Sequence, residues 1–153
     1  MTNRSLLSRA VLTATLSAIA GLASAGDTQN LTVNATVQQM CKFYGSAQTA
    51  AFGDIDPSGT SNVTANATVQ YKCTNGTTPG SLEPTSGGLS RTMSDGGSNT
   101  LAYVLSLAAT SAGSGFGSGQ EKSVAVTATI TPTQFQNAVA ATYEEVVELT
   151  ITP

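Results

Sequence analysis

Cysteine and carboxylate side chains are the residues of this sequence that could do chemistry, because it contains no histidine. A Ser–His or Cys–His nucleophile pair is therefore impossible. Cys41 and Cys73 lack the further histidine or cysteine partners that a metal site needs. An even number of cysteines in a chain with an export signal predicts one disulfide instead. Closing a loop of about 32 residues would stabilise the fold by roughly 3–4 kcal/mol in the chain-entropy model.

The carboxylates do not form a convincing catalytic pair. Asp54 and Asp56 could be a carboxylate pair or a calcium corner, but they lie in a Pro/Gly turn, where Asp is common for local reasons. Glu144 and Glu145 are neighbours in a predicted strand, so they point to opposite faces and cannot work as a paired acid and base. We therefore expect no enzyme activity, no bound metal and no cofactor.

Residues 1–25 have the features of a secretory signal peptide. Arg4 and Arg9 give a positive start, residues 10–22 are apolar, and Ala23-Ser24-Ala25 is a small-residue cleavage site. The apolar run is shorter than the roughly 20 residues of a membrane-spanning helix. We expect an exported mature chain without a membrane span.

The mature chain has the composition of an acidic all-β domain. Four basic and nine acidic residues remain once Arg4 and Arg9 are removed, which is a net charge of about −5 and argues against nucleic-acid binding. Thr, Ser, Val, Ala, Asn and Gly dominate, and short alternating segments lie between Gly/Ser/Asn/Pro turns. This pattern predicts a β-sandwich or barrel, in one domain with its own core.

The clearest strand signal lies at the start of the mature chain. Leu31, Val33, Ala35 and Val37 fall on one face and polar residues on the other, as in a strand with one buried and one solvent-exposed face. Chain ends usually fray unless something ties them down. Residues 31–37 are therefore either the first strand of the chain's own sandwich or a strand offered to a neighbouring subunit.

The remaining strands are predicted from a less regular alternation of apolar and polar residues. Further strands are expected at residues 62–72, 101–107 and 123–131. The final predicted strand carries Tyr143, Val147, Leu149 and Ile151 on one face, so the sequence ends within a strand. Other expectations are a strand end and turn at 52–59, little strand at 74–88 and a helical turn within 132–141.

Several short motifs occur in an order that is similar to that of a known family. An alternating strand ends at Cys41, and after it come Phe52-Gly53, Asp56-Pro57, Val69-x-Tyr71-x-Cys73, Arg91-x-Met93, Leu101-x-Tyr103-x-Leu105, Phe116-Gly117 and Tyr143-x-Glu145-x-Val147-x-Leu149-x-Ile151. Over nearly all of the mature chain this layout resembles the spore coat protein U-like domain, the fold of major pilins in archaic chaperone–usher fimbriae. The chain departs from the family's usual Trp-Gly at Phe116, from its aspartate at Glu145 and from its apolar last residue at Pro153.

The resemblance implies an incomplete immunoglobulin-like β-sandwich, the six-stranded pilin fold, which is completed by donor-strand exchange. It divides the chain into a signal peptide at 1–25, an N-terminal donor strand at 26–38 and the incomplete domain at 39–153. Polymerisation would then depend on the donor residues Leu31, Val33, Ala35 and Val37. The C-terminal strand bordering the acceptor groove would contribute Tyr143, Val147, Leu149 and Ile151.

The implied function is that of a structural fibre subunit. Its partners would be identical subunits joined head to tail, a periplasmic chaperone and an outer-membrane usher. The fibre would lie on the cell surface and support adhesion and biofilm formation. The alternative is a monomeric secreted or surface β-sandwich binding module, although the sequence has no tryptophan and no aromatic platform that stands out.

Overall fold

The computed structural model describes residues 26–153, so the expected signal peptide lies outside the described residues. Two units are described separately. Residues 26–35 form neither helix nor strand, and residues 36–153 contain all the regular structure of the described chain. None of the helices described in residues 26–153 is long and apolar enough to cross a membrane.

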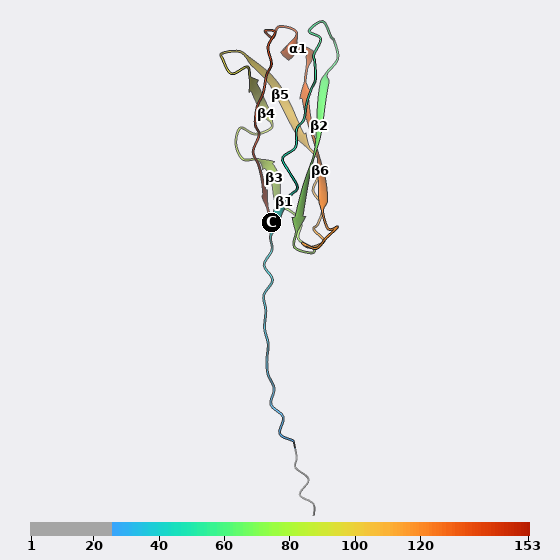
Figure 1. Ribbon diagram of the computed structural model, residues 1–153, viewed down its shortest axis with the longest axis vertical. Coiled ribbons are helices and arrows are strands. Elements are labelled where there is room, and N and C mark those ends of the chain that lie inside the picture. Colours follow the sequence, from blue (N-terminus) through green and yellow to red (C-terminus); the bar gives the residue numbers. More distant parts are fainter. Residues whose placement is uncertain (1–25) are drawn as a thin grey trace, which may run out of the picture. The chain divides into compact units, whose positions relative to one another are not determined.

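Antiparallel strands dominate residues 36–153 (Figure 1). The described elements are β1 (Cys41–Tyr44), β2 (Val63–Cys73), β3 (Ser81–Pro84), β4 (Ser90–Ser94), β5 (Thr100–Leu107), β6 (Lys122–Ile130), α1 (Pro132–Phe135) and β7 (Leu149–Thr152). One sheet has the strand order β1-β2-β6-β5-β4, and β3 pairs with β7 in a second sheet. The predicted all-β, immunoglobulin-like sandwich is thereby confirmed.

Alternation along the central strands builds the core. In β5 the side chains of Leu101, Tyr103 and Leu105 are buried and those between them are exposed. In β6 the buried residues include Val126 and Ile130. Full burial of such apolar side chains contributes about 1.5–3 kcal/mol each. The strands expected at residues 62–72, 101–107 and 123–131 are observed as β2, β5 and β6, and they carry this core.

The observed strands differ from the predicted ones where a segment forms a strand only by hydrogen bonding to a neighbouring strand. Residues 74–88, expected to contain little strand, include β3, because β7 supplies its hydrogen-bonding partner. With β3, the described residues contain seven strands in place of the six that the resemblance implies. Residues 52–59 contribute only a turn, closed by the Asp56 carbonyl and the Gly59 N–H. Of the predicted final strand only β7 is regular, and residues 143–148 are linked to β4 by an isolated bridge at Glu144.

Candidate functional site: an open side of the sandwich

Within residues 36–153, β1 and β7 are two of the edge strands, each with a hydrogen-bonded neighbour strand on one side only. β1 pairs only with β2 and β7 pairs only with β3, although β1 and β7 lie next to each other. Each of these edges presents a row of backbone N–H and C=O groups that another strand could pair with.

The chain segments that continue these edges are also largely unpaired. In the described chain, residues 46–55 make no backbone–backbone hydrogen bond with each other or with the rest of residues 26–153. Within residues 26–153, the backbone–backbone hydrogen bonds of residues 143–148 are the paired bonds between Glu144 and Ser94 and one from the Thr85 N–H to the Glu148 carbonyl. Unpaired backbone groups of this kind need water or another strand as a partner. Both segments run along the sandwich in Figure 1.

Half-buried apolar side chains line this open side. Ala50, Phe52 and Ile55 pack against the main core from the segment that follows β1. The C-terminal segment contributes the four residues predicted to border a groove: Tyr143 and Val147 pack against the same core, Ile151 packs against the cluster around the disulfide, and Leu149 is half-buried. Phe43 lies opposite the fully buried Tyr71 in the β1–β2 register, yet it is 40% exposed. The core is therefore incompletely covered on this side.

A charged pair interrupts the apolar lining. Glu145 shares the inward-facing positions of Tyr143 and Val147, and its Oε1 accepts hydrogen bonds from Arg91 Nε (3.0 Å) and Nη2 (2.5 Å). The Arg91 side chain is 9% exposed and that of Glu145 is 20% exposed. This pairing raises the pKa of Arg91 above its ordinary value. The other carboxylate oxygen, Oε2, is buried and has no hydrogen-bond partner among the described residues.

Tyr103 of β5 lies beside this ion pair. Burial, and secondly the neighbouring Glu145 carboxylate, raises the pKa of Tyr103 to about 12. Its hydroxyl therefore stays protonated at neutral pH. The Arg91–Glu145 ion pair and the Tyr103 hydroxyl together form a small polar cluster within the otherwise apolar lining of the open side.

The predicted disulfide is present at the other end of the open side. Cys41 and Cys73 are register partners in β1 and β2, and their sulfur atoms are bonded at 1.98 Å. Just outside the bond, the Met40 N–H donates to the Thr74 hydroxyl and the Thr74 N–H donates to the Met40 carbonyl. Gly113 packs so closely against Cys73 that any side chain there would clash with its backbone. These contacts fix the point at which the chain enters β1.

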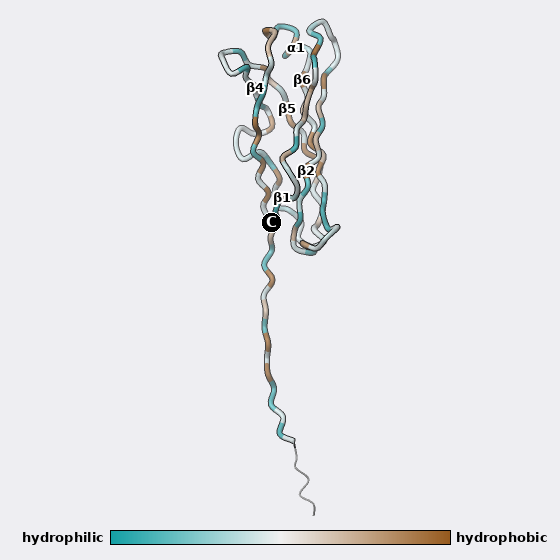
Figure 2. The backbone as a smooth tube through the Cα atoms, in the orientation of Figure 1, coloured by the Kyte–Doolittle hydropathy of each residue, from teal (hydrophilic) through white to brown (hydrophobic). Residues whose placement is uncertain are grey.

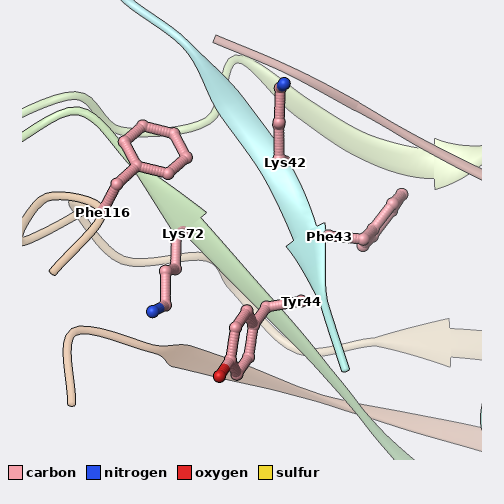
Figure 3. A pocket seen from close by; sticks show the side chains of 5 residues that line it. All are labelled: Lys42, Phe43, Tyr44, Lys72 and Phe116. Atoms are coloured by element: carbon pink, nitrogen blue, oxygen red, sulfur yellow. The ribbon is translucent and has the colours of Figure 1, made fainter. Parts of the chain in front are cut away.

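A shallow hollow of about 250 Å³ lies beside β1 and is lined by Lys42, Phe43, Tyr44, Lys72 and Phe116 (Figure 3). The Lys72 ammonium group already has three partners there. Its Nζ pairs with Glu121 at 2.9 Å, donates to the Gly117 carbonyl at 2.8 Å and lies 4.2 Å from the centre of the Tyr44 ring. The hollow therefore offers an aromatic surface but no uncommitted charge from Lys72.

The turn interpretation of Asp56 agrees with the structure. Its Oδ1 accepts hydrogen bonds from the backbone and the hydroxyl of Ser58, each at 2.8 Å, and these bonds lower the pKa of the carboxyl group. In the part of the chain that the structure describes, no three acidic or cysteine side chains come together as metal ligands.

The predicted donor residues are exposed. Leu31 and Val33 are 86% and 82% exposed, Val37 is 82% exposed, and Ala35 is also exposed. Figure 2 shows apolar and polar residues alternating along residues 31–37. The first strand of the described chain is β1, so residues 31–37 are not the first strand of the sandwich as described.

An open strand edge is a surface with which another strand can pair, and this sandwich has such edges beside an apolar-lined side. The family model of the spore coat protein U domain matches residues 27–150, and the chain belongs to this family. The family is associated with coat proteins and pili of the chaperone–usher type. No curated protein and no solved structure matches the chain.

Two parts of the open side were missed by reasoning from the sequence. Ala50, Phe52 and Ile55 were not expected to line it, because residues 46–55 show no strand-like alternation. The Arg91–Glu145 pair was also missed. A signal for it existed, because Glu145 is the charged residue among otherwise apolar inward positions from Tyr143 to Ile151.

Proposed function

We propose that this chain is a pilin, a structural subunit of a chaperone–usher surface fibre. The observation that carries the proposal is the combination, in one chain, of an open apolar side and an exposed amphipathic segment with the same strand-like alternation. Residues 26–38 would act as the donor strand, and residues 39–153 as the incomplete domain that accepts the strand of a neighbour.

The energetics favour a tight joint between subunits. Burying Leu31, Val33 and Val37 at roughly 1.5–3 kcal/mol each would contribute on the order of 5–9 kcal/mol, and Ala35 would add less. Each new backbone hydrogen bond along β1 and β7 would contribute about 0.5–1.5 kcal/mol. One donor and one acceptor per subunit make a head-to-tail contact, which propagates into an open fibre.

The same open side would need protection before assembly, because an unpaired edge is a template for aggregation. We assign that protection to a periplasmic chaperone, and the exchange of chaperone for donor strand to an outer-membrane usher. The assembled fibre would lie on the cell surface and support adhesion and biofilm formation.

Gel electrophoresis of sheared surface material in SDS, with and without boiling, tests the proposal. We expect a ladder of multimers without boiling and one monomer band after boiling, because strand-exchanged subunits separate only when they unfold. A single monomer band in both lanes would contradict the proposal and favour a monomeric surface or secreted binding module.

Two variants at neighbouring positions test the donor assignment. Val33→Arg places a charge on the inserted face and should abolish the ladder while chaperone binding is retained. Thr32→Arg places the same charge on the outer face and should leave the ladder intact. Normal fibres from the Val33→Arg variant would exclude residues 31–37 as the donor strand.

A further inference from the structure

The inward-facing side chains of residues 143–151 differ in polarity, so an incoming strand would meet a different surface at each position. Its successive inward positions are Tyr143, Glu145, Val147, Leu149 and Ile151. Four of these positions are apolar. At the remaining one a carboxylate is bonded to Arg91 through Oε1, while Oε2 is buried without a partner among the described residues.

A bulky apolar side chain placed against Glu145 would be unfavourable. It would cover the 20% of the Glu145 side chain that is still exposed, and so desolvate the carboxylate further, without supplying a hydrogen bond to Oε2, which is costly for an ionised group. A methyl group opposite the same position would leave more of this exposed part of the Glu145 side chain in contact with water. The acceptor segment therefore discriminates by size at this one position.

The donor segment contains one small residue among its inward positions. Leu31, Val33 and Val37 are large and Ala35 is small. The last strand of a complete immunoglobulin-like sandwich pairs antiparallel with the strand before it, and antiparallel ladders are also slightly the more stable. In that orientation, residues directly opposite each other project their side chains to the same face.

We propose that Ala35 of one subunit lies directly opposite Glu145 of the next, and that this pair sets the register of the inserted strand. The inference rests on the proposed donor-strand function. In this register the three large residues Val37, Val33 and Leu31 face Tyr143, Val147 and Leu149. Every large donor residue then meets an apolar residue.

Registers shifted by one or two residues from the proposed one are energetically less favourable. A shift of two residues in one direction places Val37 against Glu145, and a shift in the other direction places Val33 there. A shift of one residue turns the polar face of the donor toward the core. With Val37 at the Tyr143 end of the segment, residues 38–40 are left to join the donor strand to Cys41.

Double cysteine variants that leave Ala35 and Glu145 intact can measure the register. Directly opposite residues have Cβ atoms about 4.5–5.5 Å apart, close to disulfide geometry, whereas diagonal neighbours are about 7–8 Å apart. Val33→Cys with Val147→Cys reports the proposed register. The matched pairs Val33→Cys with Leu149→Cys and Leu31→Cys with Val147→Cys report the two shifted registers.

Assembled fibres of each variant would be mildly oxidised and run in SDS without reductant, before and after boiling. We expect a ladder that survives boiling for Val33→Cys with Val147→Cys, and ladders that collapse on boiling for the two shifted pairs. Stronger cross-linking in either shifted pair, or cross-linking in none of them, would overturn the proposed register. The ladder before boiling separates this result from a failure of the donor-strand function, which would remove the ladder itself.

Two substitutions without cysteine provide a second measurement. Ala35→Leu should lower the yield of multimers about tenfold, which corresponds to about 1.4 kcal/mol of lost binding. Val33→Leu enlarges a neighbouring donor residue that faces Val147 and should reduce the yield far less. Equal yields from the two variants would contradict the role of Ala35.

Discussion

At Glu145 a single charged side chain interrupts an otherwise apolar face, and Arg91 makes this arrangement stable. The guanidinium group donates to the carboxylate and, through Nη1, to the Ser86 carbonyl at 2.6 Å. Because both side chains are mostly buried, the pair depends on both partners being present. An ion pair of this kind is more sensitive to the loss of one partner than to the loss of both.

The variant Arg91→Met should show this sensitivity. It leaves the Glu145 carboxylate half-buried without a cation, so we expect the free energy of unfolding to fall by about 3 kcal/mol. Urea denaturation of the mature chain would measure the loss. The double variant Arg91→Met with Glu145→Leu should recover most of the stability, and an unchanged urea midpoint for Arg91→Met alone would contradict the role of the pair.

Of the contacts between individual residues, the sequence predicts the disulfide but not the ion pair. The Cys41–Cys73 bond was predictable because the chain contains no other cysteine with which either residue could pair. The Arg91–Glu145 contact was not predictable, because 54 residues separate the partners and only the folded chain brings them together.

Among the elements, β2, β5 and β6 are long strands whose alternation alone predicts them within two residues of their observed ends. The shorter strands depend on partners. β3 lies in a Gly/Pro-rich stretch with little strand signal and forms through its pairing with β7. Residues 143–148 along the open side have strand-like burial without strand-like hydrogen bonding, and hydrogen bonding is the property that sequence patterns report least directly.

β1 is the element most dependent on a covalent bond. It has only four residues, pairs on one side and exposes three of its side chains. Replacing both cysteines by alanine should lower the free energy of unfolding by about 3–4 kcal/mol, because the closed loop no longer restricts the unfolded chain. Urea denaturation and the yield of periplasmic subunit would measure this loss.

Reduction of the wild-type protein provides the matched control for this double alanine variant. Both treatments remove the same bond, so the reduced protein and the variant should have the same urea midpoint. If both midpoints equalled that of the oxidised protein, the disulfide would have no stabilising role.

The molecule as a whole carries an alternating segment, residues 31–37, that its own described sheets do not use, and an open side that none of its described strands fills. Supplying a second copy of residues 28–38 after Pro153, through a short Gly/Asn hairpin linker, should complete the sandwich within one chain. A hairpin suffices because the added strand would run antiparallel to β7.

We expect this extended chain to be monomeric in SDS without boiling and to melt about 15 °C or more above the unmodified mature chain. Differential scanning calorimetry would measure the melting temperature. The same extension carrying Val33→Arg in the added copy should give no increase. An equal increase from both extensions would show that the added segment stabilises the domain by some means other than insertion.

The position of the disulfide has a mechanical consequence for a fibre assembled in this way. Tension along the fibre would reach each subunit through residues 38–40 and arrive at Cys41, the first residue of β1. The four-residue pairing between β1 and β2 could be peeled apart one hydrogen bond at a time. The covalent bond to Cys73 instead transmits the pull to the end of β2, which is eleven residues long and paired on both sides. A shearing load on a central strand must break many hydrogen bonds together, so the single disulfide would make the shortest strand of this sheet a secure point of attachment.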